Sequence, residues 1–450
     1  MDYPIWNPSI GGGVLIGIVA ILHVVVSHFA IGGGITLGIL ETLAVRNGDR
    51  AFRELARRGS WLLVLVSTVF GAISGVAIWF TIGLVQPAAT SSLIHTFVWG
   101  WAIEWGFFLL EIVTALAYVA TWDKVRPRTH LVIIWLYAFA AFMSLVVIQG
   151  ILAFMLTPGR WIATGSFWDG FLNPSYVPGI VFRTGACLLL AGGYLTLSAL
   201  RERDRDARAR AVRLLSAISV AGAILAALGG LWWERSLPDG VTRFFLGAKP
   251  LLASLAATRH LVLWALAASA ALFLLTALLP RLQNWGLAVV ALLAAFAVLG
   301  GYERLREGAR KPFVIRDQMF SNGVLVSEID KLNRDGILSK ARWGPLERTG
   351  KAETGRAVFR AECSSCHTLD GYLGIRKIVE PMDADLATMF LTALRDDGAA
   401  WKALRAGDAT AKPGYPMMPP FVGTDAELDA LARYLVGLNA QKVAEASRAR

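Results

Sequence analysis

The stretch GGVLIGIVAILHVVVSHFAIGGGITLGIL, residues 12–40, carries no Lys, Arg, Asp or Glu. A helix of about 20 apolar residues crosses the hydrocarbon core of a bilayer. Because backbone polar groups cannot stay unpaired in lipid, this stretch is predicted to cross a membrane as a helix. The sequence predicts an all-α, polytopic bundle of eight spans, since seven similar runs follow: Trp61–Leu84, Leu93–Thr121, Leu131–Leu156, Gly179–Leu200, Ala211–Trp232, His260–Leu279 and Trp285–Tyr302.

The composition divides the chain into two regions. Hydrophobic residues make up 55% of the 450 and charged residues 17%, against about 25% charged residues in ordinary water-soluble domains. The apolar runs end near Gly301, and the sequence beyond is charged and ordinary. We expect a transmembrane domain over 1–325, a linker over 326–345, a small helical domain over 346–440 and a flexible tail over 441–450.

The net charge of +11 is concentrated in the loops after odd-numbered spans. The loop 85–92 has no Lys or Arg, and the loop 157–178 has only Arg160. By the positive-inside rule the odd loops face the cytoplasm and the N-terminus faces out, so the charge reflects topology and not nucleic-acid binding. Eight spans return the C-terminal domain to the outer side. These features indicate a multi-pass protein of a bacterial inner membrane with a periplasmic C-terminal domain.

The N-terminus is expected to be retained. A cleavable signal peptide needs a basic start and a small-residue cleavage site, and the first ten residues contain Asp2 but no Lys or Arg.

Residues 363–367 read CSSCH, the C-x-x-C-H pattern of covalent haem attachment. Two thiols at this spacing can add to the two vinyl groups of one haem, and the next imidazole then reaches the iron. A disulfide or half of a zinc site is the alternative. Zinc would need a second Cys pair, whereas the third cysteine, Cys187, stands alone within a predicted span.

The surroundings of this motif favour haem. A predicted helix, 350–362, comes before it, and the proline-flanked stretch PMMPPF follows at 416–421. The closing helix, Thr424–Leu438, opens with a capping box. The stretch from about 346 to 440 resembles a class I cytochrome c. The resemblance implies one covalent haem c on Cys363 and Cys366, with His367 and Met418 as axial ligands and Met417 as the adjacent alternative.

Four ionisable residues inside the predicted spans are candidate site residues: His23, His28, Glu104 and Glu111. Ionisable groups are costly in lipid and usually mark function there. The alternative for each is a packing residue with a hydrogen-bond partner.

Residues 10–325 also resemble subunit I of cytochrome bd quinol oxidases. His23 stands eighteen residues before Glu41, at the end of a segment reading GILET. The third predicted span carries two carboxylates seven residues apart, one residue closer than in the family pattern. Residues 307–313 read EGARKPF, which is similar to the family's E-x-G-R-Q-P-W signature with the glycine shifted by one.

The resemblance implies two membrane haems, of b type or with one of d type. His23 and Glu307 would hold iron, and Arg310 would meet haem propionates. Glu104 and Glu111 would conduct protons from the cytoplasm to the membrane haems.

The chain departs from this family at its low-spin haem and at its quinol site. Arg183 and Leu261 stand where the family has the histidine and methionine ligands of that haem. The haem is therefore expected to be absent, or rebuilt with His260. Only Glu234–Arg259 replaces the long quinol loop, and the cytochrome c-like domain replaces the ninth helix.

These features predict an oxygen reductase that receives electrons through haem c instead of quinol, with nitric oxide as an alternative substrate. A non-catalytic electron-transfer subunit of a larger respiratory complex is the alternative function, and a quinol-reactive cytochrome b ranks lower. The expected partners are membrane lipid, a second membrane subunit like subunit II of cytochrome bd, and a periplasmic electron donor protein.

Overall fold

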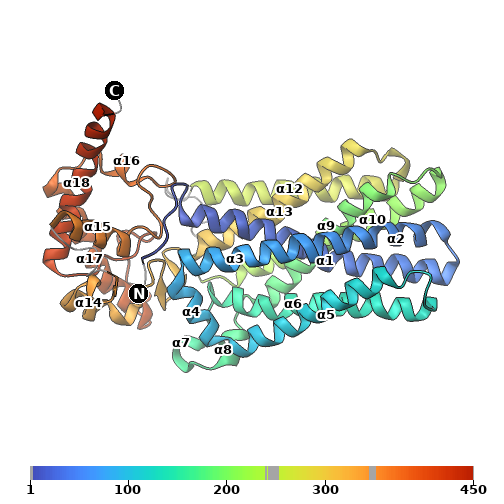
Figure 1. Ribbon diagram of the computed structural model, residues 1–450, viewed down its shortest axis with the longest axis horizontal. Coiled ribbons are helices and arrows are strands. Elements are labelled where there is room, and N and C mark those ends of the chain that lie inside the picture. The colour runs from blue at the N-terminus through green and yellow to red at the C-terminus, as the bar shows by residue number, and fades with distance from the viewer. Residues whose placement is uncertain (1–3, 239–240, 242–252, 344–350, 449–450) are drawn as a thin grey trace. The chain divides into compact units, whose positions relative to one another are not determined.

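The computed structural model describes residues 4–238, 241, 253–343 and 351–448. It contains eight helical spans long and apolar enough to cross a membrane, as the sequence predicted (Figure 1). The spans are α1 (Gly12–Asn47), the continuous segment Arg50–Val85, α5 (Val98–Ala120), α6 (Pro127–Phe154), α9 (Tyr176–Ala199), α10 (Arg205–Arg235), α12 (Ala253–Leu278) and α13 (Trp285–Arg310). The all-α membrane fold is thus confirmed.

The second span is not a uniform helix. It consists of α2 (Arg50–Val64), a π-helical turn η1 (Leu65–Phe70) and α3 (Gly71–Val85). A π turn inserts extra backbone into a helix and is often found at functional sites. The turn lies just before Ser74 and Gly75, which contact the ring of His23.

Helix ends extend beyond the apolar runs because capping residues fix them. Asp49 caps α2 by accepting hydrogen bonds from Ala51 N at 2.9 Å and Phe52 N at 3.2 Å. Asp204 caps α10 in the same way. These two spans therefore begin in charged segments that hydropathy alone leaves out.

Contacts divide the chain into two compact units, and the larger comprises residues 20–77 and 96–309. Within it, α9 and α10 approach closely through glycine. A Cβ on Gly185 would lie 2.3 Å from Ala226 N, and one on Gly229 would lie 2.3 Å from Phe182 N. Small residues allow this backbone approach between membrane helices. Shorter helices connect the spans: α7 (Trp161–Thr164), α8 (Phe167–Phe171) and the 3-10 turn η3 (Pro280–Leu282).

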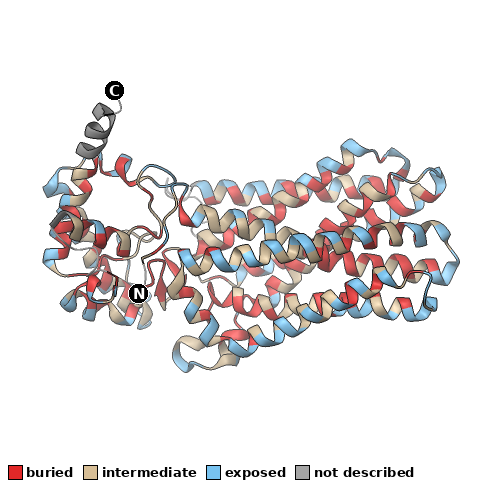
Figure 2. Cartoon of the chain, in the orientation of Figure 1, coloured by how far each residue is buried: buried red, intermediate tan, exposed pale blue. Residues whose placement is uncertain are grey.

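Many large apolar side chains on the spans are exposed (Figure 2). Trp99 is 72% exposed, Phe80 69% and Trp264 75%. In water such surfaces would be unfavourable, whereas lipid or another membrane subunit would cover them. The eight apolar helices therefore fit a membrane protein.

The other unit comprises residues 1–19, 78–95 and 310–450. It contains α4 (Pro87–Thr96), which ends at its border, and an antiparallel pair, β1 (Phe313–Ile315) and β2 (Met319–Phe320). Its remaining elements are η4 (Val326–Glu328), α14 (Ile329–Asp335), η5 (Ile337–Ser339), α15 (Lys351–Glu362), α16 (Ile375–Val379), α17 (Ala384–Arg405) and α18 (Asp425–Arg448).

The segment expected to be a linker is folded in its described part. Ile329 and Ile337 are buried in the same hydrophobic cluster as Phe359 of α15 and Leu431 of α18. The Glu427 carboxylate accepts hydrogen bonds from the backbone of this segment, at 3.0 Å from both Ile337 N and Leu338 N. Helix α18 continues to Arg448 and so includes most of the expected tail.

Candidate functional site

The CSSCH motif forms a helical turn directly after α15. Cys363 N donates to Phe359 O at 2.9 Å, and His367 N donates to Cys363 O at 2.9 Å. This turn presents two thiols and one imidazole from consecutive positions. All three cysteines of the chain are free thiols, so Cys363 and Cys366 are both available for thioether bonds.

A hydrogen bond fixes the tautomer of the His367 imidazole that an iron ligand requires. Its Nδ1 lies 2.9 Å from Leu373 O, and because a carbonyl oxygen can only accept, Nδ1 carries the proton. Nε2 is then left with its lone pair, the arrangement that backbone carbonyls commonly impose on metal-binding histidines. Burial lowers the pKa of His367, and the nearby Lys311 charge lowers it further. Both effects favour the neutral, ligating form.

The loop that carries Met418 is anchored to α17. Gly414 N and Tyr415 N donate to the Asp397 carboxylate at 2.7 and 2.8 Å, and Met418 N donates to Tyr415 O at 3.0 Å. Met418 itself packs against the core of this unit. The residues Cys363, Cys366, His367 and Met418 therefore fit a haem c in donor chemistry and in the tautomer of the imidazole.

A segment from the N-terminus lies against the haem-attachment turn. Asn7 Nδ2 donates to His367 O at 2.9 Å. A Cβ on Gly371 would lie 2.0 Å from Ser9 O, so only glycine fits there. Asn7, Ser9 and Tyr434 line a cavity of about 660 Å³ beside α15. Lys311 contacts the same turn, with Nζ 3.8 Å from Cys366 Sγ.

His23 has one ring nitrogen fixed and the other open. Its Nδ1 lies 3.1 Å from Ser74 Oγ, whose own hydrogen is donated to Phe70 O at 2.6 Å. Nδ1 is therefore the donor, and Nε2 keeps its lone pair without a hydrogen-bond partner among the described residues. A Cβ on Gly75 would lie 3.3 Å from His23 Cε1, so glycine keeps this side of the ring uncrowded. His23 fits a haem ligand.

His28 does not fit a haem ligand, although the sequence made it a candidate. Its Nδ1 lies 2.7 Å from Val24 O and its Nε2 3.3 Å from Arg183 Nη1. Both ring nitrogens are occupied by protein groups, so no lone pair is left for iron.

Arg183 is the centre of a buried network that the sequence analysis missed. It is 2% exposed, and its Nε donates to Gln149 Oε1 at 2.8 Å and its Nη2 to Glu303 Oε1 at 2.5 Å. Glu303 Oε2 also accepts from Arg306 Nε at 3.0 Å. The signal was present, because an arginine inside a span needs a partner, but its partners come from the distant α6 and α13.

Glu307 and Arg310 lie in the last turn of α13. Glu307 Oε1 accepts from Arg306 Nη2 at 2.8 Å, and its side chain is 41% exposed. Arg310 Nη1 donates to Val314 O at 3.1 Å. Both residues thus have protein partners, and their roles towards haem stay predictions.

Glu104 and Glu111 both face α6. Ser144 Oγ donates to Glu104 Oε1 at 2.8 Å, and Tyr137 OH donates to Glu111 Oε1 at 3.2 Å. In contrast, His260 is exposed on α12 and lies next to Leu261, which is 55% exposed. The structure therefore offers no sign that His260 joins the Arg183 network.

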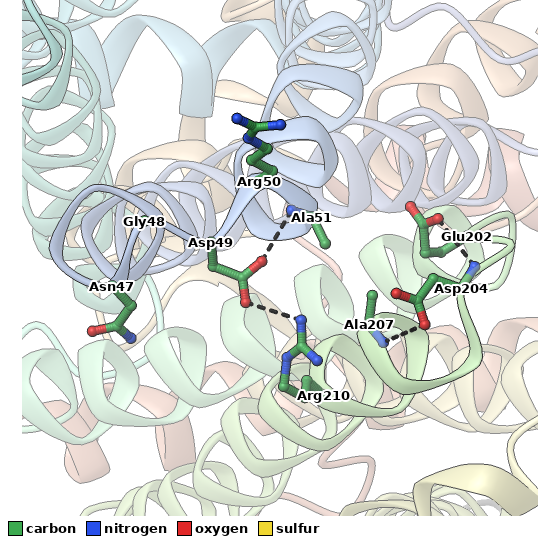
Figure 3. A pocket seen from close by; sticks show the side chains of 9 residues that line it. All are labelled: Asn47, Gly48, Asp49, Arg50, Ala51, Glu202, Asp204, Ala207 and Arg210. Atoms are coloured by element: carbon green, nitrogen blue, oxygen red, sulfur yellow. Dashed lines mark hydrogen bonds and ion pairs between the residues drawn. The ribbon is translucent and has the colours of Figure 1, made fainter.

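A cavity of about 580 Å³ lies between the α1–α2 and α9–α10 turns. Figure 3 shows the residues that line it. Its carboxylates have structural partners: Asp49 and Asp204 cap helices, and Asp49 pairs with Arg210 at 3.2 Å. Among the described residues, no group of three or more His, Cys, Asp or Glu could hold a metal ion. The polar residues of this cavity therefore cap and connect helix ends.

Comparisons with known proteins agree with both domains. The family described as cytochrome bd terminal oxidase subunit I matches residues 14–237, and that described as cytochrome c oxidase, cbb3-type, subunit III matches residues 350–435. The solved bd oxidase from Geobacillus thermodenitrificans is 16% identical and matches with a TM-score of 0.61, covering 70% of this chain and 90% of that chain. That match shows a shared fold. A search among curated proteins finds no match.

Proposed function

We propose that this chain, which joins a cytochrome bd subunit I-like membrane domain to a C-terminal cytochrome c domain, is an oxygen reductase. Its electrons would arrive through haem c. The coarse assignment, a respiratory haem protein with electron-transport domains, follows from the two family matches. The oxygen chemistry and the electron route are the proposal.

The residues of the c domain would hold one covalent haem. Cys363 and Cys366 would form the thioether bonds, and His367 and Met418 would ligate the iron. A His/Met ligand pair stabilises reduced iron and gives a high reduction potential. The domain is thus suited to accept electrons from a periplasmic donor protein.

One observation carries the oxygen-reductase assignment. His23 has Nδ1 fixed by Ser74 and an open Nε2, while His28, five residues later on α1, has both nitrogens occupied. A single available imidazole supports a haem ligated from one side. Haem iron, when bound there, supplies the redox chemistry for a gaseous substrate. Glu307 is the proposed ligand of a second membrane haem, with Arg310 towards its propionates.

The Arg183 network supports electron input through haem c. The Arg183 guanidinium forms hydrogen bonds with Gln149, His28 and Glu303. The lone pairs that could bind iron at this position are therefore already engaged. We propose that the low-spin haem of the family is absent here and that the membrane domain holds two haems, b type or one d type.

We place the protein in a bacterial inner membrane with the c domain in the periplasm, beside a second membrane subunit like subunit II of cytochrome bd. Protons would reach the site from the cytoplasm past Glu111 and Glu104. These side chains lie on the α6-facing side of α5.

Two measurements on the purified protein test the proposal. A pyridine haemochrome assay should give one c haem and two non-covalent haems per chain. Carbon monoxide added to reduced protein should shift the Soret band beyond the shift of denatured haem, and His23→Ala should abolish this shift. Oxygen uptake should be supported by an artificial one-electron donor but not by quinol.

The assay also separates the alternatives. If the protein has its full haem complement but gives no carbon monoxide shift and no oxygen uptake, it is an electron-transfer subunit. Turnover of nitric oxide in place of oxygen would change the substrate and leave the site unchanged.

A further inference from the structure

Glu41, Tyr118 and His130 form a buried cluster to which nothing above gives a role. Their exposed fractions are 2%, 0% and 4%, and they come from α1, α5 and α6. Tyr118 OH donates to Glu41 Oε2 at 2.7 Å. The His130 ring bridges the other two residues, with Nδ1 2.6 Å from Glu41 Oε1 and Nε2 3.0 Å from the Tyr118 carbonyl oxygen.

These contacts fix the number of protons that the cluster holds. A carbonyl oxygen only accepts, so His130 Nε2 must carry a hydrogen. The short contact between Nδ1 and Glu41 Oε1 then needs one further proton, which resides either on the imidazole or on the carboxyl. In both arrangements the Glu41–His130 pair stores one exchangeable proton inside the membrane domain.

The cluster continues a series of polar pairs between α5 and α6. Glu104 pairs with Ser144 and Glu111 with Tyr137, and Tyr118 pairs with His130. On each helix successive members are seven residues apart, which is about two turns or 10 Å along the axis. All three pairs therefore follow one line, and about three hydrogen-bond lengths separate neighbouring pairs. A proton that moved along this line would need water molecules to bridge these gaps.

The cluster lies directly beneath an exposed turn. The Trp122 ring packs 4.2 Å from the His130 ring, centroid to centroid. The next residue, Asp123, has a side chain that is 50% exposed and is paired with Arg53 and Arg57. By the topology proposed above, this turn faces the cytoplasm, so the cluster is the innermost member of the series on that side.

We propose that the Glu41–His130 pair is the proton-loading site at the cytoplasmic end of the Glu111–Glu104 route, with Tyr118 as a positioning residue for the carboxylate. A proton arriving from the Asp123 side displaces the stored proton, which leaves towards Glu111. The pair therefore holds one proton before and after each transfer. This inference deepens the proposed function and rests on it for the direction of flow.

Glu41→Gln tests the proposal, because the amide still accepts from Tyr118 and still meets His130 but cannot release a proton. In the haem-loaded protein, proton uptake upon anaerobic reduction, followed with a pH-sensitive dye, should slow about tenfold or more. The solvent isotope effect on this uptake should rise. His130→Gln should match Glu41→Gln, and the double variant should be no slower than either, since the two residues act as one site.

Thr42→Val is the matched control. Trp135 Nε1 donates to Thr42 Oγ1 at 3.1 Å, so this variant removes a hydrogen bond between the same two helices, one residue from Glu41, without touching a titratable group. Its proton uptake should equal that of the unmutated protein.

Wild-type uptake in both Glu41→Gln and His130→Gln would overturn the proposal. An equal slowing in Thr42→Val, or slowing in proportion to lost haem with an unchanged isotope effect, would also overturn it and assign the pair a structural role. If neither variant folds, Tyr118→Phe decides: it removes only the hydroxyl that donates to Glu41 Oε2, so proton uptake should slow, and unchanged uptake would overturn the proposal. Oxygen uptake is a separate readout, so failure of the proposed function remains distinguishable.

Discussion

Arg183 and Glu303 form an ion pair that is buried on all sides, with the two residues 2% and 7% exposed. The pair joins α9 to α13, and the further hydrogen bonds of Arg183 reach α6 through Gln149 and α1 through His28. Gly179 makes room for this arrangement, since a Cβ there would lie 1.9 Å from Gln149 Nε2. Four membrane helices are thus fastened at one point.

We expect Arg183→Leu to destabilise the membrane domain by about 1–3 kcal/mol, because Glu303 Oε1 loses its hydrogen-bond donor in a buried site while Arg306 Nε still holds Oε2. Denaturation in mixed micelles, followed by loss of helical signal, measures this change. Arg183→Leu combined with Glu303→Leu should recover part of the loss, since no carboxylate is then left short of a donor and Arg306 keeps its contact with Glu307. A double variant that is less stable than Arg183→Leu alone would contradict this interpretation.

His23→Ala should remove about one non-covalent haem per chain and leave the covalent haem in place, because the variant loses the imidazole whose Nε2 is open. Pyridine haemochrome spectra measure both quantities. His95→Ala is the control, since His95 is exposed and its Nδ1 is bonded to Ser91 O. Equal haem content in the two variants would rule out His23 as a ligand.

Lys311→Met should lower the midpoint potential of haem c. The Lys311 ammonium lies beside Cys366, where its positive charge disfavours the more positive, oxidised iron. A Coulomb interaction that solvent screens to about 0.5–1 kcal/mol corresponds to a shift of roughly 20–40 mV in a one-electron potential. Redox titration measures the shift, and Lys311→Arg should keep the original value. A rise in potential upon Lys311→Met would refute the electrostatic argument.

The stability of the c domain should fall as the pH rises above the ordinary range of a glutamate carboxyl. Burial raises the pKa of Glu362 well above its usual value, and the nearby Glu427 charge raises it further. Between the pKa of Glu362 in the unfolded chain and its higher pKa in the folded protein, the folded protein keeps a proton that the unfolded chain has lost. Unfolding therefore becomes easier as pH increases. Once the pH exceeds the folded-state pKa, the decline should stop.

Denaturant titrations of the haem-loaded protein at several pH values, read from the Soret band, test this expectation. Glu362→Gln should flatten the dependence, since an amide can keep the hydrogen bond from Asn322 Nδ2 to the side-chain oxygen, now 2.7 Å. A wild-type stability that rises with pH across this range would contradict the assignment.

The spans and the haem-attachment turn could be predicted because their signals are local. Apolar runs longer than a bilayer is thick identify helices, and the CSSCH motif places its three side chains within one turn. The network around Arg183 could not be predicted, because Gln149 and Glu303 lie far away in sequence and nothing near Arg183 points to them. His28 is a residue type that can bind iron, and only the structure shows that Val24 O and Arg183 Nη1 occupy its two ring nitrogens.

Only one side of the series of pairs between α5 and α6 could be predicted from the sequence. Glu104 and Glu111 were found as costly charges inside a span. Their partners Ser144 and Tyr137 are ordinary residues for a membrane helix, so the register of the two helices had to be known first.

The burial of Ile329 and Ile337 in the core shared with α15 and α18 determines where an isolated c domain must begin. The matched cytochrome family begins at residue 350, whereas the folded body already includes the residues after α13. The described residues between α13 and α15 therefore contribute to the hydrophobic core that stabilises the c domain. An excised c domain starting at residue 350 should therefore aggregate, and one starting near Lys311 should remain dispersed.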